Sequence, residues 1–235
     1  KKDGDVPPPP HHEEISHETF HTVEIGGIPV KYSATAGRLI LTEEEGKKKA
    51  SFFFVAYTRS GVKDKSKRPI VFAFNGGPGS SSVWLHLGRF GPRRVLLDYD
   101  GMPYRPPGRL TDNEHSLLDV ADLVFVDPVG TGLSKTVPQE SAGESKEKTT
   151  PDTFYWDANK DLDALCEFIA AFLSREGRWA SPVFIAGESY GGYGPDRICG
   201  AVDYEYNIGK YEVTAGQYTE FLNAVAATDA YGLYN

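Results

Sequence analysis

A serine lies between glycines at the end of an apolar run in the segment FIAGESYGGYGPD, residues 184–196. Gly187, Ser189 and Gly191 form a G-x-S-x-G pattern, which is typical of a sharp strand-to-helix turn that exposes a serine hydroxyl. Small flanking residues are needed there because larger side chains collide at the turn. The pattern predicts Ser189 as a catalytic nucleophile, and a plain glycine-rich loop is the alternative interpretation.

A second glycine-rich motif, NGGPGSSS, occupies residues 75–82 and also follows an apolar run. Acyl transfer needs backbone N–H donors aimed at the developing oxyanion, and glycines let the backbone approach that closely. The sequence therefore predicts an oxyanion hole made by Gly77 and by the N–H group of Tyr190, which follows the serine. A phosphate-binding loop is excluded because its pattern requires a lysine that this motif lacks.

The third motif, VDPVGTGLS, spans residues 126–134 and carries only two glycines of a dinucleotide-binding fingerprint, Gly130 and Gly132. No helix signal follows it, so a structural turn is a better interpretation than a cofactor site. His17 and His21 have the i, i+4 spacing of a helical metal pair, but they have neither a helix signal nor a third ligand. We therefore expect neither a cofactor nor a metal.

Three apolar runs must position these motifs: residues 69–75, 121–127 and 182–187. Their residues do not alternate with polar ones, which indicates strands that are covered on both faces. Between the last two runs, residues 158–177 place apolar side chains at helical spacing and end at Gly177. A strand, a helix and a strand in succession predict parallel strands in an α/β fold, with functional loops beyond their carboxyl ends.

Over about residues 20–193, NGGPGSSS, VDPVGTGLS and AGESYGG in this order resemble the serine carboxypeptidase family of α/β-hydrolases. The resemblance implies an incomplete α/β-hydrolase fold, with a mixed, mostly parallel sheet and helices on both faces. It implies that C-terminal residues of peptides are released through an acyl-enzyme on Ser189. By the same resemblance, Asn75 and Glu188 bind the free C-terminal carboxylate, and the protein is periplasmic or secreted.

Two residues qualify this expectation. Glu188 can hydrogen-bond a carboxylate only when it is protonated, because two ionised carboxylates in contact repel each other. We therefore expect activity to favour acid pH. Arg89 occupies a position in HLGRFGP where the family's carboxylate network leads us to expect an acidic residue.

The general base of a catalytic triad is missing from the sequence. In α/β-hydrolases the triad runs along the chain as serine, then an acid, then histidine. All six histidines precede Ser189: His11, His12, His17, His21, His86 and His115. We therefore expect a fragment that lacks the triad Asp and His and is inactive alone. A non-catalytic peptide-binding module, and an esterase or acyltransferase with the same elbow, are the alternatives.

The ends of the chain differ from this hydrolase pattern. Residues 1–18 combine a polyproline run with charges and predict a disordered leader before a hydrolase part at 19–193. Residues 194–235 are expected to be an unrelated segment. Its part from about residue 198, which includes YNIGKYEVTAGQYTEFLNAV, resembles the start of a formylglycine-generating, sulfatase-modifying type domain. The chain is thus predicted to be truncated and chimeric.

Composition limits the partners. A formal net charge of -8 argues against a nucleic-acid partner, since such binding depends on clustered Lys and Arg. No segment has the roughly 18 to 20 continuous apolar residues of a membrane span. Cys166 and Cys199 form no metal or redox pattern, and the oligomeric state is left open.

Overall fold

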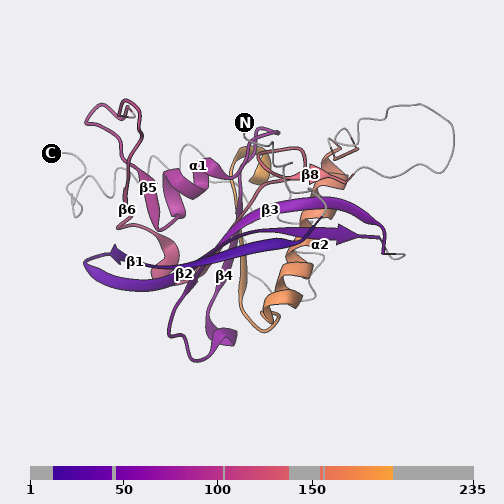
Figure 1. Ribbon diagram of the computed structural model, residues 1–235, viewed down its shortest axis with the longest axis horizontal. Helices are drawn as coiled ribbons and strands as arrows, with labels where there is room; N and C mark the ends of the chain where they lie inside the picture. The colour runs from indigo at the N-terminus through magenta and orange to yellow at the C-terminus, as the bar shows by residue number, and fades with distance from the viewer. Residues whose placement is uncertain (1–12, 44–45, 103, 138–153, 156, 193–235) are drawn as a thin grey trace, which may run out of the picture. The chain divides into compact units, whose positions relative to one another are not determined.

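A computed structural model describes residues 13–43, 46–102, 104–137, 154–155 and 157–192 (Figure 1). The strands in this part of the chain are β1 (Ile15–Ile25), β2 (Ile28–Thr42), β3 (Lys48–Arg59), β4 (Ile70–Phe74), β5 (Arg93–Val95), β6 (Leu110–Asp112), β7 (Asp122–Val126), β8 (Lys135–Thr136) and β9 (Val183–Gly187). The α-helices are α1 (Val83–Leu85), continued by a π-helical turn at His86–Phe90, and α2 (Ala158–Glu176). Short 3₁₀ turns lie at Lys65–Lys67, Leu117–Asp119 and Ser189–Gly192.

The main sheet has the strand order β1-β2-β3-β7-β4-β9, and β8 pairs with β3. Strands β4 and β7 are parallel, and so are β4 and β9. The other ladders of this sheet are antiparallel. The three apolar runs therefore form neighbouring parallel strands, as expected, but the described part of the sheet has more antiparallel ladders than parallel ones. β5 and β6 form a separate antiparallel pair.

Helix α2 begins and ends where the sequence places its signals. Asp157 caps the helix by accepting hydrogen bonds from the N–H groups of Asn159 and Lys160. Gly177 ends it in the left-handed conformation with φ 62°, which glycine adopts without steric cost. The buried face includes Phe168, which is fully buried and packs against Phe52 with 5.2 Å between ring centroids.

Both faces of the central strands are covered (Figure 1). On one face, alternate residues of β4 such as Phe72 pack in a core with α2. On the other face, Val71 and Phe125 pack in a second core with Leu85 of α1. The absence of polar alternation in these strands follows from this double coverage, because both sets of side chains are removed from water. The α/β class predicted from the sequence is confirmed.

The start of β1 differs from the expected leader. Ile15 pairs with Arg38 and His17 with Ala36, so the strand begins inside the segment 1–18 that was predicted to be disordered. Most of β1 is exposed on both faces. Backbone pairing with the long strand β2, rather than apolar burial, therefore orders residues 15–18. Residues 1–12 lie outside the described part.

Two further observations concern the C-terminal segment and the possibility of a membrane-spanning helix. The segment 194–235, which is expected to be unrelated to the hydrolase part, lies outside the described residues. Among the helices that are described, none is both long and apolar enough to span a bilayer.

Candidate active site

Ser189 lies on a tight turn directly after β9. Its φ of 54° makes it the single non-glycine residue with positive φ in the described ranges. A methyl group at Gly187 would collide with the carbonyl of Gly191 and lie 2.7 Å from the nitrogen of Gly192. Glycine is therefore required for the turn to close, and the strained serine conformation is the one expected at a nucleophile elbow. The Ser189 residue is exposed.

The loop after β4 lies against this turn. A methyl group at Gly76 would lie 2.5 Å from the carbonyl oxygen of Glu188 and would also collide with the backbone nitrogen of Tyr190. Gly77 comes next, with φ 120° in a region that favours glycine. The structure thus brings the NGGPG loop beside the backbone of the elbow. The role of the Gly77 and Tyr190 N–H groups as oxyanion donors stays a prediction.

Asn75 and Glu188 meet at the ends of β4 and β9. The Asn75 side-chain nitrogen Nδ2 donates a hydrogen bond of 3.3 Å to Oε2 of Glu188. On its other side, Oδ1 of Asn75 accepts a hydrogen bond of 3.1 Å from the N–H of Leu85. Asn75 is 4% exposed, whereas Glu188 is exposed. The pair that the resemblance assigns to carboxylate binding is therefore in contact, with its acidic member open to solvent.

Three of the described histidines have partners other than the serine. His86 stacks on Phe125 with 4.5 Å between ring centroids, and its Nε2 shares a hydrogen bond of 2.6 Å with the Tyr57 hydroxyl. Burial lowers the pKa of His86 to about 4. His21 shares a hydrogen bond with Thr19, and exposed His115 pairs with Glu114. In the part of the chain that the structure describes, no histidine hydrogen-bonds Ser189.

The VDPVGTGLS loop is hydrogen-bonded to the NGGPGSSS loop, a contact that the sequence analysis did not predict. Asp127 is buried at the end of β7, where its carboxylate accepts hydrogen bonds from Ser82 and Leu133. The Ser134 hydroxyl donates a hydrogen bond of 2.7 Å to the Asp127 carbonyl oxygen and accepts one of 2.8 Å from the N–H of Phe53. A buried aspartate after an apolar strand, followed by proline and glycines, was the available signal.

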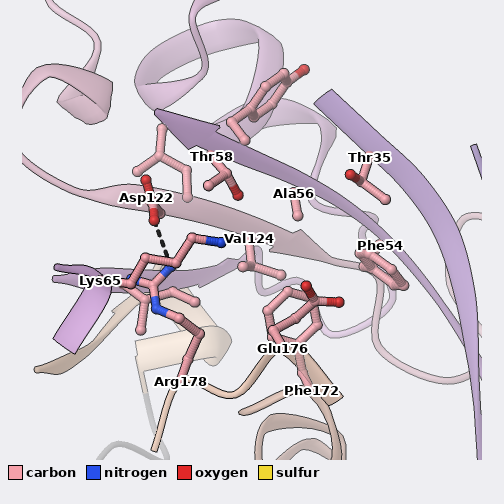
Figure 2. A pocket seen from close by; sticks show the side chains of 13 residues that line it. Thr35, Phe54, Ala56, Thr58, Lys65, Asp122, Val124, Phe172, Glu176 and Arg178 are labelled. Atoms are coloured by element: carbon pink, nitrogen blue, oxygen red, sulfur yellow. Dashed lines mark hydrogen bonds and ion pairs between the residues drawn. The ribbon is translucent and has the colours of Figure 1, made fainter. Parts of the chain in front are cut away.

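A second polar cluster lies at the opposite end of the parallel strands, where Asp122 begins β7. Its carboxylate accepts a hydrogen bond from Arg68 Nε at 2.7 Å. It also accepts one from Arg178 Nη1 at 2.6 Å (Figure 2). The cavity beside it measures about 30 Å³ and is also lined by Lys65 and Glu176. This volume suits little more than one water molecule, so the cluster is structural. Across the described residues, no three His, Cys, Asp or Glu side chains gather as a metal site.

Comparisons with known proteins agree with the motifs. The profile of the Serine carboxypeptidase family matches residues 28–199. Pheromone-processing carboxypeptidase KEX1 of Saccharomyces cerevisiae is 31% identical over 166 residues, which cover 67% of this chain and 20% of the relative. Serine carboxypeptidase 1 of Hordeum vulgare is 30% identical over 170 residues, which cover 71% of this chain and 30% of the relative.

A solved structure is also similar: the crystal structure of KEX1(Δ)p, a prohormone-processing carboxypeptidase from Saccharomyces cerevisiae. It shares 25% identity with a TM-score of 0.44, and the alignment covers 87% of this chain and 36% of that one. The chain thus spans only 20% to 30% of the length of the two relatives described above. The family match runs past residue 193, where the hydrolase part was expected to end, and stops at residue 199. Because the profile matches well over half of the sequence, the chain belongs to the serine carboxypeptidase family.

Proposed function

We propose that this chain carries the nucleophile, the oxyanion donors and the carboxylate-binding pair of a serine carboxypeptidase. Ser189 attacks the last peptide bond, the N–H groups of Gly77 and Tyr190 stabilise the oxyanion, and Asn75 with Glu188 holds the C-terminal carboxylate. In the described part of the chain, no histidine is bonded to Ser189 as its general base. A secreted or periplasmic location follows from the same family resemblance.

The contact between Asn75 and Glu188 beside the strained Ser189 carries this proposal. Asn75 comes from one loop, and Glu188 and Ser189 come from another. The hydrogen bond between Asn75 and Glu188 joins residues that are 113 positions apart in the sequence. Pairing of β4 with β9, in which Phe74 lies opposite Gly187, brings the loops together. An amide donor and a carboxyl group next to an exposed serine suit a peptide whose last residue has a free carboxylate.

The absence of a bonded histidine in the described ranges favours binding without turnover for this stretch of chain. A serine hydroxyl is a poor nucleophile until a base takes its proton. We expect Ser189 to react slowly with a fluorophosphonate probe and S189A not to react. Rapid labelling of the wild-type chain, abolished in S189A, would show that a base is present and would contradict this part of the proposal.

Ligand binding tests the carboxylate pair directly. Isothermal titration of a short peptide with a free C-terminus should show binding at pH 5 that weakens by about tenfold or more on amidation of that end, since a charge-assisted hydrogen bond contributes about 1.5–3 kcal/mol.

Glu188→Gln provides the sharper test. Glutamine supplies a hydrogen-bond donor and lacks the negative charge of an ionised carboxylate, so E188Q should bind the free-carboxyl peptide more tightly than the wild type at pH 7.5. E18Q is the matched control, because Glu18 is exposed on β1 and the same chemical change there should leave the affinity unchanged. Equal affinity of the wild type and E188Q at pH 7.5 would remove Glu188 from the site.

A further inference from the structure

Asp127 joins two loops that the proposed reaction does not otherwise connect. The residue follows β7 and is 6% exposed. Its Oδ1 accepts hydrogen bonds from the Ser82 N–H at 2.9 Å and from the Ser82 hydroxyl at 3.0 Å, and its Oδ2 accepts one from the Leu133 N–H at 3.2 Å. Both carboxylate oxygens therefore serve as acceptors, and within the described residues Asp127 forms no salt bridge.

The surrounding backbone is shaped to this carboxylate. Gly132 has φ 48°, and a methyl group there would collide with Oδ2 of Asp127 and lie 2.9 Å from Cβ of Ser81. A side chain at position 132 would thus push apart the two loops that Asp127 joins. The second glycine of GTG therefore lets the turn close over the carboxylate.

From Ser82 the contacts continue to the predicted carboxylate site. Ser82 directly precedes α1, and its hydroxyl is used by Asp127 rather than as a helix cap. Three residues later, the N–H of Leu85 donates to Oδ1 of Asn75. An N–H donor requires the amide oxygen as its acceptor, so this bond decides which way the Asn75 amide is turned. The NH₂ group is thereby directed at Glu188.

We infer that Asp127 is a positioning residue that orients the Asn75 amide through Ser82 and Leu85. The carboxylate holds the start of α1, the third residue of that helix holds the amide oxygen, and the amide NH₂ is presented to the ligand. The functional part of this inference rests on the proposed role of Asn75 in carboxylate binding. The orientation of the amide itself does not depend on that role.

Asp127→Asn breaks the arrangement with almost no change in volume. Asparagine has one acceptor oxygen, so its NH₂ group must face either the Ser82 donors or the Leu133 N–H, and one of these hydrogen bonds is lost. S82A is a milder variant, because it removes one hydroxyl and keeps the backbone N–H that bonds Asp127. D98N is the matched control: Asp98 accepts two backbone N–H groups in an exposed loop, from Asp100 and Met102.

Two measurements read the positioning separately from the binding. Selective ¹⁵N-leucine labelling follows the Leu85 amide, and the side-chain NH₂ signals of Asn75 are identified by their loss in N75A. We expect both sets of signals to shift in D127N and, to a smaller extent, in S82A, but not in D98N. Affinity at pH 5 for the free-carboxyl peptide should fall about tenfold in D127N and about threefold in S82A.

The outcomes are distinct. Unshifted Leu85 and Asn75 signals in both D127N and S82A, with only the resistance to denaturant lowered, would overturn the inference. If D127N does not fold, S82A decides, because it loses a single hydroxyl. Failure of the wild-type chain to bind the peptide would refute the proposed carboxylate site, while the Leu85 and Asn75 signals would still decide whether Asp127 positions the amide.

Discussion

The carboxylate of Asp122 ties together the starts of three parallel strands, and its removal should strongly destabilise the fold. Arg68 precedes β4, Asp122 begins β7 and Arg178 precedes β9. The side chains of Arg68, Asp122 and Arg178 are 9%, 3% and 4% exposed. The Asp122 carboxylate also accepts a hydrogen bond of 3.0 Å from the N–H of Arg59. In the described residues, this carboxylate is the single anion bonded to two buried guanidinium groups. Figure 2 shows its contact with Arg178.

The expected cost of Asp122→Asn follows from these contacts. One charge-assisted hydrogen bond is lost, worth about 1.5–3 kcal/mol, and breaking a buried ion pair costs about 3–5 kcal/mol in all because a charge stays unpaired. Neutral acceptors offset part of this, since Arg68 also donates to the Leu118 carbonyl and Arg178 to that of Arg68. We expect a loss of about 3 kcal/mol in the free energy of unfolding, a large share of the roughly 5–15 kcal/mol of a typical domain.

Urea denaturation followed by circular dichroism measures this loss. With a slope of about 2 kcal/mol per molar urea, the midpoint should fall by about 1.5 M. D119N is the control, because Asp119 contributes its backbone carbonyl to the Arg59 side chain and its side chain is exposed. It should stay within about 0.5 kcal/mol of wild type. A D122N variant that stays within about 1 kcal/mol of wild type would refute the reasoning.

Three further results are expected. G76A should lower the free energy of unfolding by more than about 2 kcal/mol in urea denaturation, because its methyl group would overlap the backbone of the turn at Ser189. G88A is the control, since no atom lies near the added carbon there. Equal effects of the two variants would contradict the contact between Gly76 and this turn. Burial raises the pKa of Asp161 from 3.8 to about 6, so the folded state binds this proton more tightly than the unfolded chain, and stability should fall as pH rises from about 4 through 6. Urea denaturation at pH 5 and pH 8 measures this loss of stability, which should be smaller in D161N than in the wild type. An equal loss in both proteins would argue against a role for Asp161 in the pH dependence. In the described part of the sheet, β9 is the last strand, and its Phe184 is 50% exposed. F184K should therefore reduce self-association in light scattering without moving the urea midpoint, and equal association in both proteins would count against strand pairing at β9.

The local pattern of the sequence was sufficient for the parallel strands, for α2 and for the tight turn at Ser189. The residues of β4 are apolar without alternation because both faces of the strand are covered, and this is visible in five consecutive residues. The end of α2 at Gly177 and the turn at Ser189 are likewise specified by residues in contact with their near neighbours in sequence. Such signals are local because backbone conformation is set by a few adjacent side chains.

Only the tertiary structure decided which of these elements lie together. Periodicity reports that a strand is buried but not which strand lies beside it, so the position of β7 between β3 and β4 could not be read from the sequence. The extension of β1 back to Ile15 depends on a pairing with Arg38. The bond from Asp127 to Ser82 spans 45 positions and exists because β7 and β4 end side by side. The sequence thus determined the chemical groups and their local turns, whereas the contacts that orient Asn75 depend on strand pairing between distant segments.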